Sequence, residues 1–184
     1  TENAGNNMSI MNGIQHPDSY YTWGSNWWNN YGYYNLWSAD NTVTGDTNVG
    51  NDNPVVKTVY DPSPVGFKMP ANNAFTGFTT TGNNSITPSE INIDGTNNWQ
   101  AYQNNFGNNF WTSSSKTATI YFPASGWRDR IDGSLSLVSD RGCFWSAVPG
   151  DKYDGCCLVF SWSYLYPLAR NFRIYGMAAR PVSE

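Results

Sequence analysis

Residues 142–182 read GCFWSAVPGDKYDGCCLVFSWSYLYPLARNFRIYGMAARPV, and this stretch decides the fold class. Three runs in it, residues 142–146, 157–162 and 174–181, are rich in strand-forming residues and bounded by turn residues, which predicts β-strands. In the second run the residues at 158, 160 and 162 are large and apolar and alternate with smaller ones. That period of two predicts a strand with one buried face.

The segment between the last two runs, residues 163–173, mixes Tyr, Leu, Arg, Asn and Phe without a period. This mixture is unlike a polar loop and similar to an antibody paratope, where rigid aromatic side chains give contact area at low entropic cost. We therefore expect an irregular contact surface here. The alternative is that these aromatic residues complete the core.

Segments that precede residue 142 also carry signals for strands and loops. Residues 117–122 (TATIYF) and 55–60 (VVKTVY) predict two further strands, each stopped by a proline-containing turn. Residues 18–37 carry nine large aromatic side chains interleaved with Asn, Ser and Gly. So much apolar area predicts ordered strands and turns that pack onto the core. Residues 40–53, rich in Asn, Asp and Gly, predict an exposed loop.

Two short helices complete the expected elements. Asn72 or Asn73 can cap a helix over residues 74–78, because an Asn side chain accepts a hydrogen bond from a free helical amide. Residues 99–106 predict the second helix. The sum is a single α+β domain over residues 1–184, made mostly of antiparallel sheet with one or two short helices and long loops.

Composition argues against several partners. Charged residues make up 13% of the chain, aromatic residues 16%, and the net charge is −4 without a cluster of Lys or Arg. We therefore expect neither nucleic acid nor an anionic membrane as a partner. No apolar run is long enough to span a bilayer, and the first seven residues lack a signal-peptide pattern. We expect a soluble segment without direct membrane insertion, either a mature product or an excised fragment.

The sequence offers few groups for catalysis. Its one histidine, His16, has no cysteine or carboxylate at ligand spacing, so we expect a surface position. No nucleophile motif and no glycine-rich phosphate cradle is present. The adjacent Cys156 and Cys157 lack the spacing of a redox pair, and in a strand their side chains would point to opposite faces. We expect no enzymatic activity and no cofactor.

Carboxylates could still act in pairs, as they do in glycosidases. The candidates are Asp129, Asp132, Asp140, Asp151 and Asp154. All lie in turn-like contexts, where Asp commonly hydrogen-bonds its own backbone, so we expect a structural use. Asn- and Asp-rich segments offer oxygens without a complete EF-hand spacing, which leaves calcium binding open and predicts no metal site.

Four motifs follow one another along the chain: YDPSPVGFKMP at residues 60–70, FPASGWR at 122–128, FWSA at 144–147, and a final pattern of Arg173, Gly176 and Arg180-Pro-Val. Together they resemble the major paralogous (FISUMP-type) domains of gut bacterial surface lipoproteins and fimbrial proteins, over roughly residues 17–182. The family pattern usually has Cys where Ser63 stands, so no disulfide or thiol role is expected at that position.

The resemblance implies a C-type-lectin-like fold, related to that of the formylglycine-generating enzyme. Some members are variable proteins of diversity-generating retroelements, whose C-terminal segment is diversified at template adenines, with Asn codons as favoured targets. Of the 24 Asn residues only Asn171 lies after residue 109. Residues 142–182 therefore fit a diversified segment. The chain lacks the Glu-Pro-Asn and Gln-Pro-Asp tripeptides of calcium-dependent sugar sites, which argues against that mode of binding.

Several residues of this segment are expected to be scaffold. We expect Gly142, Gly155 and Gly176 to serve turns or close backbone approach. Arg173 and Arg180 are expected to tie loop carbonyls or carboxylates together.

We therefore expect a non-catalytic adhesin or receptor-binding domain at the bacterial cell surface or outside the cell, within a longer lipoprotein or fimbrial protein. Its ligand would be a protein or glycan on a host, bacterial or phage surface. The expected contact residues are Val148, Asp151, Tyr153, Asp154, Cys156, Val159, Ser161, Tyr164, Tyr166, Arg170, Phe172 and Tyr175.

Two rival hypotheses remain open. The first is a structural pilus or surface-protein subunit whose tail packs against a neighbouring subunit. The second is an enzyme of the sulfatase-activating type, suggested by fold kinship alone. That activity needs a reactive cysteine pair, for which Cys143 with Cys156 or Cys157 is a poor substitute.

Overall fold

The computed structural model describes residues 10–22, 37–39, 53–95, 99–150 and 153–184. In this part the chain is mostly β-sheet with few helices, which is compatible with the expected α+β class. The aromatic segment expected to be ordered at residues 18–37, and the loop expected at residues 40–53, lie largely outside the described residues.

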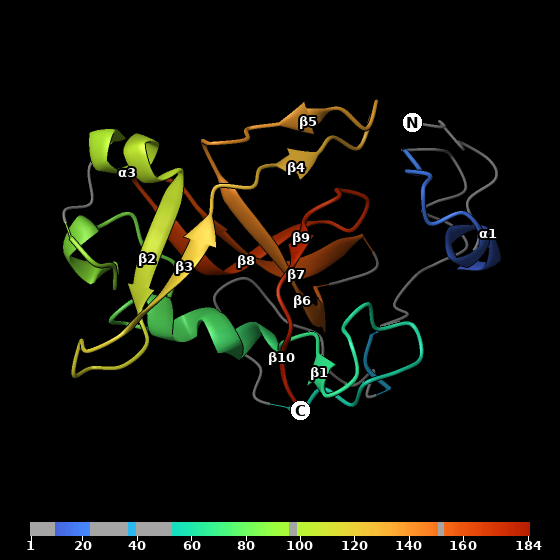
Figure 1. Ribbon diagram of the computed structural model, residues 1–184, viewed down its shortest axis with the longest axis horizontal. Helices are drawn as coiled ribbons and strands as arrows, with labels where there is room; N and C mark the ends of the chain where they lie inside the picture. Colours follow the sequence, from blue (N-terminus) through green and yellow to red (C-terminus); the bar gives the residue numbers. More distant parts are fainter. Residues whose placement is uncertain (1–9, 23–36, 40–52, 96–98, 151–152) are drawn as a thin grey trace.

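The central sheet is built from four strands within residues 142–179. Its strands are β6 (Gly142–Pro149), β7 (Asp154–Phe160), β8 (Leu165–Phe172) and β9 (Ala178–Ala179), in the order β8-β7-β6-β9. β6, β7 and β8 are antiparallel neighbours, whereas β9 pairs with β6 in parallel. The chain therefore crosses from one edge of the sheet to the other between β8 and β9 (Figure 1).

Three two-stranded sheets surround the central one. They are β2 (Gly107–Trp111) with β3 (Thr119–Pro123), β4 (Trp127–Arg128) with β5 (Leu135–Ser136), and β1 (Phe67–Lys68) with β10 (Val182–Ser183). Figure 1 shows the β4–β5 hairpin at the top of the molecule and the β1–β10 ribbon at the bottom, beside the C-terminus.

The helices are short. α1 (Ile10–Gln15) and α3 (Trp99–Asn105) are α-helices, while η1 (Asn72–Phe78) and η2 (Pro88–Glu90) are 3-10 helices. The helix expected at residues 99–106 is thus confirmed. The Asn cap expected for residues 74–78 is wrong, because η1 already begins at Asn72 and Ala71 takes the N-cap position without a side-chain hydrogen bond.

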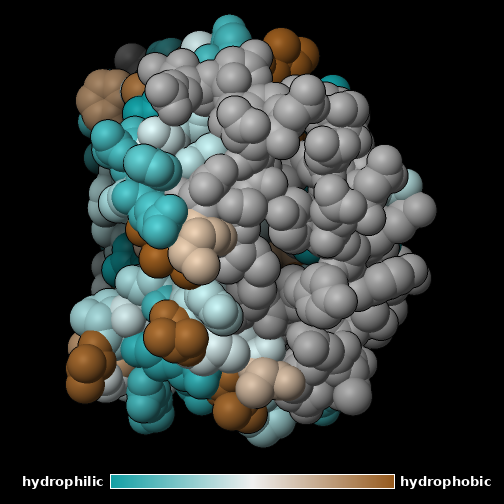
Figure 2. Space-filling model, turned by 90° about the vertical axis from the view of Figure 1, so that its right-hand side faces the viewer, coloured by the Kyte–Doolittle hydropathy of each residue, from teal (hydrophilic) through white to brown (hydrophobic). Residues whose placement is uncertain are grey.

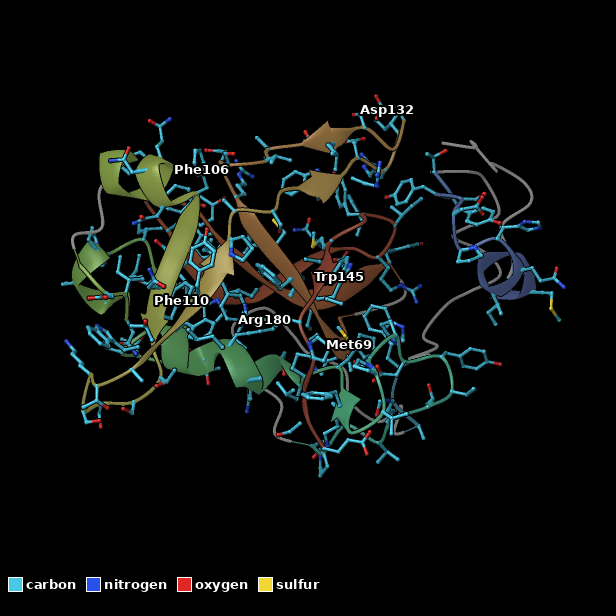
Figure 3. All side chains as sticks on the ribbon, in the orientation of Figure 1. Met69, Phe106, Phe110, Asp132, Trp145 and Arg180 are labelled. Carbon is cyan, nitrogen blue, oxygen red and sulfur yellow. The ribbon has the colours of Figure 1, made fainter. Side chains whose placement is uncertain are left out.

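Both faces of the central sheet are covered. Phe144, Leu158 and Phe160 on one face pack with Phe110 and Phe122 of the β2–β3 hairpin. The alternate residues on the other face join a second cluster: Cys143, Trp145, Cys157, Val159, Ala169, Val55 and Met69. Figure 3 shows Phe110 at the β2–β3 end of the sheet, and Trp145 and Met69 at the other end. The core therefore has two parts with the sheet between them.

The structure corrects the predicted bounds of β7, the predicted exposure of one of its faces, and the prediction for residues 163–173. β7 begins three residues earlier than expected and is buried on both faces, whereas Trp162 lies beyond it and is exposed. Residues 163–173, expected to be irregular, mostly form β8. Their period is hidden because strands buried on both faces do not alternate, and a register shift between Cys157 and Val159 breaks the pairing of β7 with β8.

Two further strand predictions are also corrected. Residues 174–181 contribute only the two residues of β9, because the chain turns after β8, where the N–H of Tyr175 donates to the carbonyl of Phe172 at 3.0 Å. Residues 55–60 form no strand in the described part of the chain. Their strand pairing there is one isolated bridge between Lys57 and Ser38, and a turn follows at Thr58.

Close packing explains why Gly142 and Arg180 stand at their positions. A Cβ on Gly142 would lie 2.1 Å from the ring of Phe160, so only glycine lets β6 approach that ring. Arg180 Nη1 donates to the carbonyl of Tyr121 at 2.5 Å, and its guanidinium carbon lies 4.3 Å from the centroid of the Phe122 ring. Both residues join distant parts of the chain, as expected for scaffold.

The turn at residues 60–70 is built around a buried carboxylate. Asp61 accepts hydrogen bonds from the backbone N–H groups of Ser63 at 2.8 Å and Met69 at 2.9 Å. Hydrogen bonds from N–H groups to a carboxylate are stronger than neutral ones. The DPSPVGFKMP motif is therefore a structural turn that delivers Met69 to the core.

Candidate functional site

Seven half-buried side chains form a continuous series of ring contacts on the surface, which we call the aromatic–arginine row. In order of contact they are Arg130, Phe172, Tyr175, Trp127, Arg141, Tyr164 and Tyr166. β4, the β4–β5 turn, the residue before β6, and β8 with its flanking residues supply them. Segments far apart in the sequence thus contribute to one surface.

Arg141 occupies the middle of the row. Its guanidinium carbon lies 5.6 Å from the centroid of the Trp127 ring and 5.8 Å from that of Tyr164, so each ring is within cation–π distance. The Arg141 side chain is 37% exposed, and its Nε lies 3.7 Å from the Asp140 carboxylate, which is too long for a hydrogen bond. The guanidinium therefore lies between the two rings, forms an ion pair with Asp140, and stays partly accessible to solvent.

Tyr164 and Tyr166 form one end of the row. Their rings are stacked, with centroids 4.7 Å apart and planes inclined by 26°. Both pack against the second core cluster, which contains Cys143 and Val159. Burial raises the pKa of Tyr164, and the nearby Arg141 charge opposes that shift. The Tyr164 hydroxyl is therefore neutral at physiological pH and can both donate and accept hydrogen bonds.

Phe172 and Tyr175 form the other end. Arg130 lies over Phe172, with its guanidinium carbon 4.9 Å from the ring centroid. The Tyr175 ring is 6.3 Å from Phe172 and 5.4 Å from Trp127, which links the two halves of the row. Trp127 Nε1 is buried and has no hydrogen-bond partner among the described residues.

The structure divides the contact residues expected from the sequence. Tyr164, Tyr166, Phe172 and Tyr175 are brought together in the row. Asp154 and Arg170 form an ion pair with a nitrogen–oxygen distance of 3.6 Å. Tyr153 is half-buried, and its carbonyl accepts a hydrogen bond from the N–H of Arg173 at 2.9 Å. Asp151 lies outside the described residues.

Four of the expected contact residues are buried: Val148, Cys156, Val159 and Ser161. Val159 packs on the face of β7 that carries the second core cluster, and Val148 packs with Cys156 and Ala71. Val159 and Ser161 were expected at the surface because the strand predicted over residues 157–162 was expected to bury one face only. Both faces of the central sheet are covered, so Val148 in β6 and Cys156 in β7 are buried as well. The four side chains therefore present almost no area to a ligand.

Sequence reasoning missed Trp127, Arg130 and Arg141 as members of the site. Trp127 was noted only within the FPASGWR motif, and the two arginines lie in segments without a strand signal. The available signal was that all six arginines fall within residues 128–180, the region that also holds the candidate contact residues.

The three cysteines are free and buried. Burial raises the pKa of the Cys143 thiol to about 12, and it raises that of Cys157 well above its usual range. Since the thiolate is the nucleophilic form, these two thiols are poor nucleophiles at neutral pH. Cys156 and Cys157 contribute to different core clusters, which confirms that their side chains point to opposite faces.

The aspartates of the β4–β5 turn have structural partners. Asp129 accepts a hydrogen bond from the N–H of Ile131 at 2.8 Å, and Asp132 accepts one from the N–H of Ser134 at 2.9 Å. The bonds from Ser134 lower the pKa of Asp132, which Figure 3 shows at the tip of the turn. Within the described ranges, no three His, Cys, Asp or Glu side chains are grouped so as to hold a metal ion.

Comparison with known proteins adds no relative. No protein-family model, no curated protein and no solved structure matches the chain. In the described part of the molecule, no helix has the length and apolar character needed to cross a lipid bilayer.

Proposed function

We propose that this chain is a non-catalytic ligand-binding domain and that the aromatic–arginine row is its contact surface. The observation that carries the proposal is the uninterrupted series of ring and guanidinium contacts from Arg130 to Tyr166, all in half-buried side chains. Trp, Tyr and Arg are the residues most enriched among those that dominate binding energy at interfaces.

The position of the row on the scaffold supports a preformed site. Trp127 lies in β4 and Tyr166 in β8, and both pack against the second core cluster. Contact residues on paired strands lose little conformational freedom when a ligand binds, which favours affinity. The partly exposed guanidinium of Arg141 favours ligands that carry oxygen acceptors, as both proteins and glycans do.

The burial of the thiols supports a binding role over a sulfatase-activating enzyme. Such an enzyme needs a reactive cysteine pair, whereas Cys143 is fully buried with a pKa of about 12, and Cys156 and Cys157 face different clusters. Protonated thiols that face apart make poor partners in thiol chemistry.

The resemblance to FISUMP-type domains adds a finer proposal. We propose a C-type-lectin-like domain of a bacterial surface protein, with a C-terminal segment diversified by a retroelement. Burial of most positions in β6 and β7 limits tolerated diversity, because substitutions in a packed core are destabilising. The partly exposed positions Tyr164, Tyr166, Phe172 and Tyr175 are the sites at which variation would alter binding without loss of the fold.

Two observations test these proposals. Arrays of glycans and of displayed host, bacterial and phage proteins would be screened with the wild-type chain, then with Tyr166→Ala and Arg141→Ala. Each variant should weaken a selected ligand at least tenfold, about 1.4 kcal/mol. Ile86→Ala is a matched control, because it removes an exposed apolar side chain outside the row. Unchanged binding by both row variants would place the contact surface elsewhere.

The second observation is the coding DNA. An adjacent near-copy of codons 142–182, with adenines where the two copies differ, is expected for a retroelement-diversified protein. Identical codons at the four partly exposed positions Tyr164, Tyr166, Phe172 and Tyr175 in all sister copies would contradict diversification, and would leave the binding proposal standing.

A further inference from the structure

Tyr20 connects the N-terminal segment to the aromatic–arginine row, at the contact between Tyr175 and Trp127. Residues 10–22 lie beside the open end of the β4–β5 hairpin in Figure 1, and Figure 2 shows that side of the molecule, with hydrophobic side chains interspersed among hydrophilic ones. Tyr20 is half-buried, and Thr22, two residues further on, is buried. The end of this segment therefore packs against the rest of the molecule.

The Tyr20 hydroxyl meets two carbonyl oxygens that belong to different segments of the row. It donates to the carbonyl oxygen of Ile174, and the carbonyl oxygen of Arg128 lies 3.3 Å from it. Ile174 directly precedes Tyr175, and Arg128 directly follows Trp127. One hydroxyl group thus lies between the backbone segments that carry two contacting aromatic residues of the row, whose ring centroids are 5.4 Å apart.

The two segments also meet directly, through an isolated β-bridge. The N–H of Arg128 donates to the carbonyl of Gly176 at 2.8 Å, and the N–H of Gly176 donates to the carbonyl of Arg128 at 3.1 Å. β4 has two residues and pairs with the equally short β5. Since a two-stranded hairpin is marginally stable by itself, the place of β4 beside residues 174–176 depends on contacts such as this bridge and the Tyr20 hydroxyl.

Gly176 shows how closely the Tyr20 ring packs on the bridge. A Cβ at residue 176 would lie 2.9 Å from Cε2 of Tyr20 and 3.0 Å from Cβ of Arg128, so a methyl group there would push the ring or the arginine away. This is the close approach expected for Gly176 from the sequence. Burial raises the pKa of Tyr20 to about 12, so its hydroxyl keeps its proton at physiological pH and can donate it to a carbonyl oxygen.

We propose that Tyr20 is a positioning residue of the ligand-binding surface and holds Trp127 against Tyr175. The proposal rests on the proposed function of the row, and it adds the N-terminal segment to the parts of the chain that shape the site. Tyr164 and Tyr166 lie at the far end of the row, beyond Arg141. Loss of the Tyr20 hydroxyl should therefore loosen the contact between Trp127 and Tyr175 and leave the tyrosine stack unchanged.

NMR spectroscopy on the whole chain tests the positioning without a ligand. Tyr20→Phe removes the hydroxyl and keeps the ring. In a chain labelled with fluorotryptophan, it should shift the fluorine resonance of Trp127, which is assigned by Trp127→Phe. It should also speed amide hydrogen exchange at Arg128 and Gly176 about five- to tenfold, as expected for the loss of one hydrogen bond. Tyr20→Ala, which removes the ring as well, should enlarge both effects.

Tyr121→Phe is the matched control. The Tyr121 hydroxyl also donates to backbone carbonyls, those of Asn105 at 2.6 Å and Phe106 at 3.1 Å, which lie outside the row. This variant should leave the fluorine resonance of Trp127 and the exchange of both amides at their wild-type values. Circular dichroism checks that all variants remain folded.

Two NMR results would overturn the proposal: a wild-type resonance and wild-type exchange rates in Tyr20→Phe, or the same changes in Tyr121→Phe, which would indicate a general loosening of the fold. A ligand selected on the wild type should bind Tyr20→Phe about five- to tenfold more weakly, and unchanged affinity would also overturn it. If Tyr166→Ala and Arg141→Ala bind as the wild type does, the row is not the contact surface. The NMR measurements still decide whether Tyr20 positions Trp127, so the two failures are distinguishable.

Discussion

Replacing Gly142 with alanine tests whether the contact between β6 and β7 is as close as the structure shows. The new Cβ would lie 2.1, 2.2 and 2.7 Å from three carbon atoms of the Phe160 ring. That ring cannot move freely, because it meets Phe110 at a centroid distance of 5.4 Å, Phe144 at 6.3 Å and Tyr102 at 6.4 Å. Forcing extra atoms into a packed core costs about 1–3 kcal/mol, and such a constrained ring favours the upper end.

Urea denaturation followed by circular dichroism measures the loss in the free energy of unfolding. In a thermal melt of a chain of this size, a loss of about 3 kcal/mol corresponds to a fall in Tm of roughly 6–12 °C. Gly77→Ala is the control, since a Cβ there meets nothing within 4 Å. Gly142→Ala combined with Phe160→Leu should cost clearly less than the sum of the two single changes, because the smaller side chain makes room. Wild-type stability of Gly142→Ala, or strict additivity of the pair, would refute the packing argument.

Asp61→Ala should lower the free energy of unfolding by about 2–4 kcal/mol in the same assay, because two buried N–H groups lose their charged acceptor; a change below about 1 kcal/mol would argue against this. Arg180→Ala should cost about 1–2 kcal/mol, and Arg180→Lys should recover only part of it, since an ammonium group does not reproduce the planar stacking on Phe122. Native protein treated with iodoacetamide at pH 8 should stay unlabelled at Cys143, and labelling before unfolding, detected by mass spectrometry, would contradict its burial. Burial raises the pKa values of Cys143 and Tyr20 to about 12, so on raising the pH the unfolded state loses these two protons before the folded state does. The free energy of unfolding should therefore not change through these groups below about pH 9, and should fall between about pH 9 and 12. A rise in the free energy of unfolding over that window would contradict the burial of both groups.

The sequence allowed the strands near residues 119–123, 142–149 and 154–160 to be located, because strand-forming residues there are bounded by turn residues. It did not show how many faces of β7 are buried. Phe110 and Phe122 cover one face while Val55 and Met69 cover the other, and all four lie far before β7 (Asp154–Phe160) along the chain. The alternation of residues within β7 carries no information about side chains that pack on it from distant parts of the sequence, so one face of β7 was expected to be exposed.

The candidate site shows the same division. Tyr164 and Tyr166 could be proposed from the sequence because large aromatics in an irregular, Arg-containing segment are typical of contact surfaces. Trp127 and Arg141 could not, because they reach those tyrosines only through the pairing of β4 with β5 and through the start of β6. Their place in the site depends on tertiary structure.

The last strands have a consequence for synthesis on the ribosome. β9 lies beside β6, and β10 pairs with β1, so Phe67 meets Ser183 only after more than a hundred intervening residues have been made. Until then the emerging chain carries apolar strands whose final neighbours do not yet exist. Non-local pairing of this kind slows folding and exposes intermediates to aggregation. A nascent chain of this protein is therefore exposed to aggregation until residues 178–183 have left the exit tunnel.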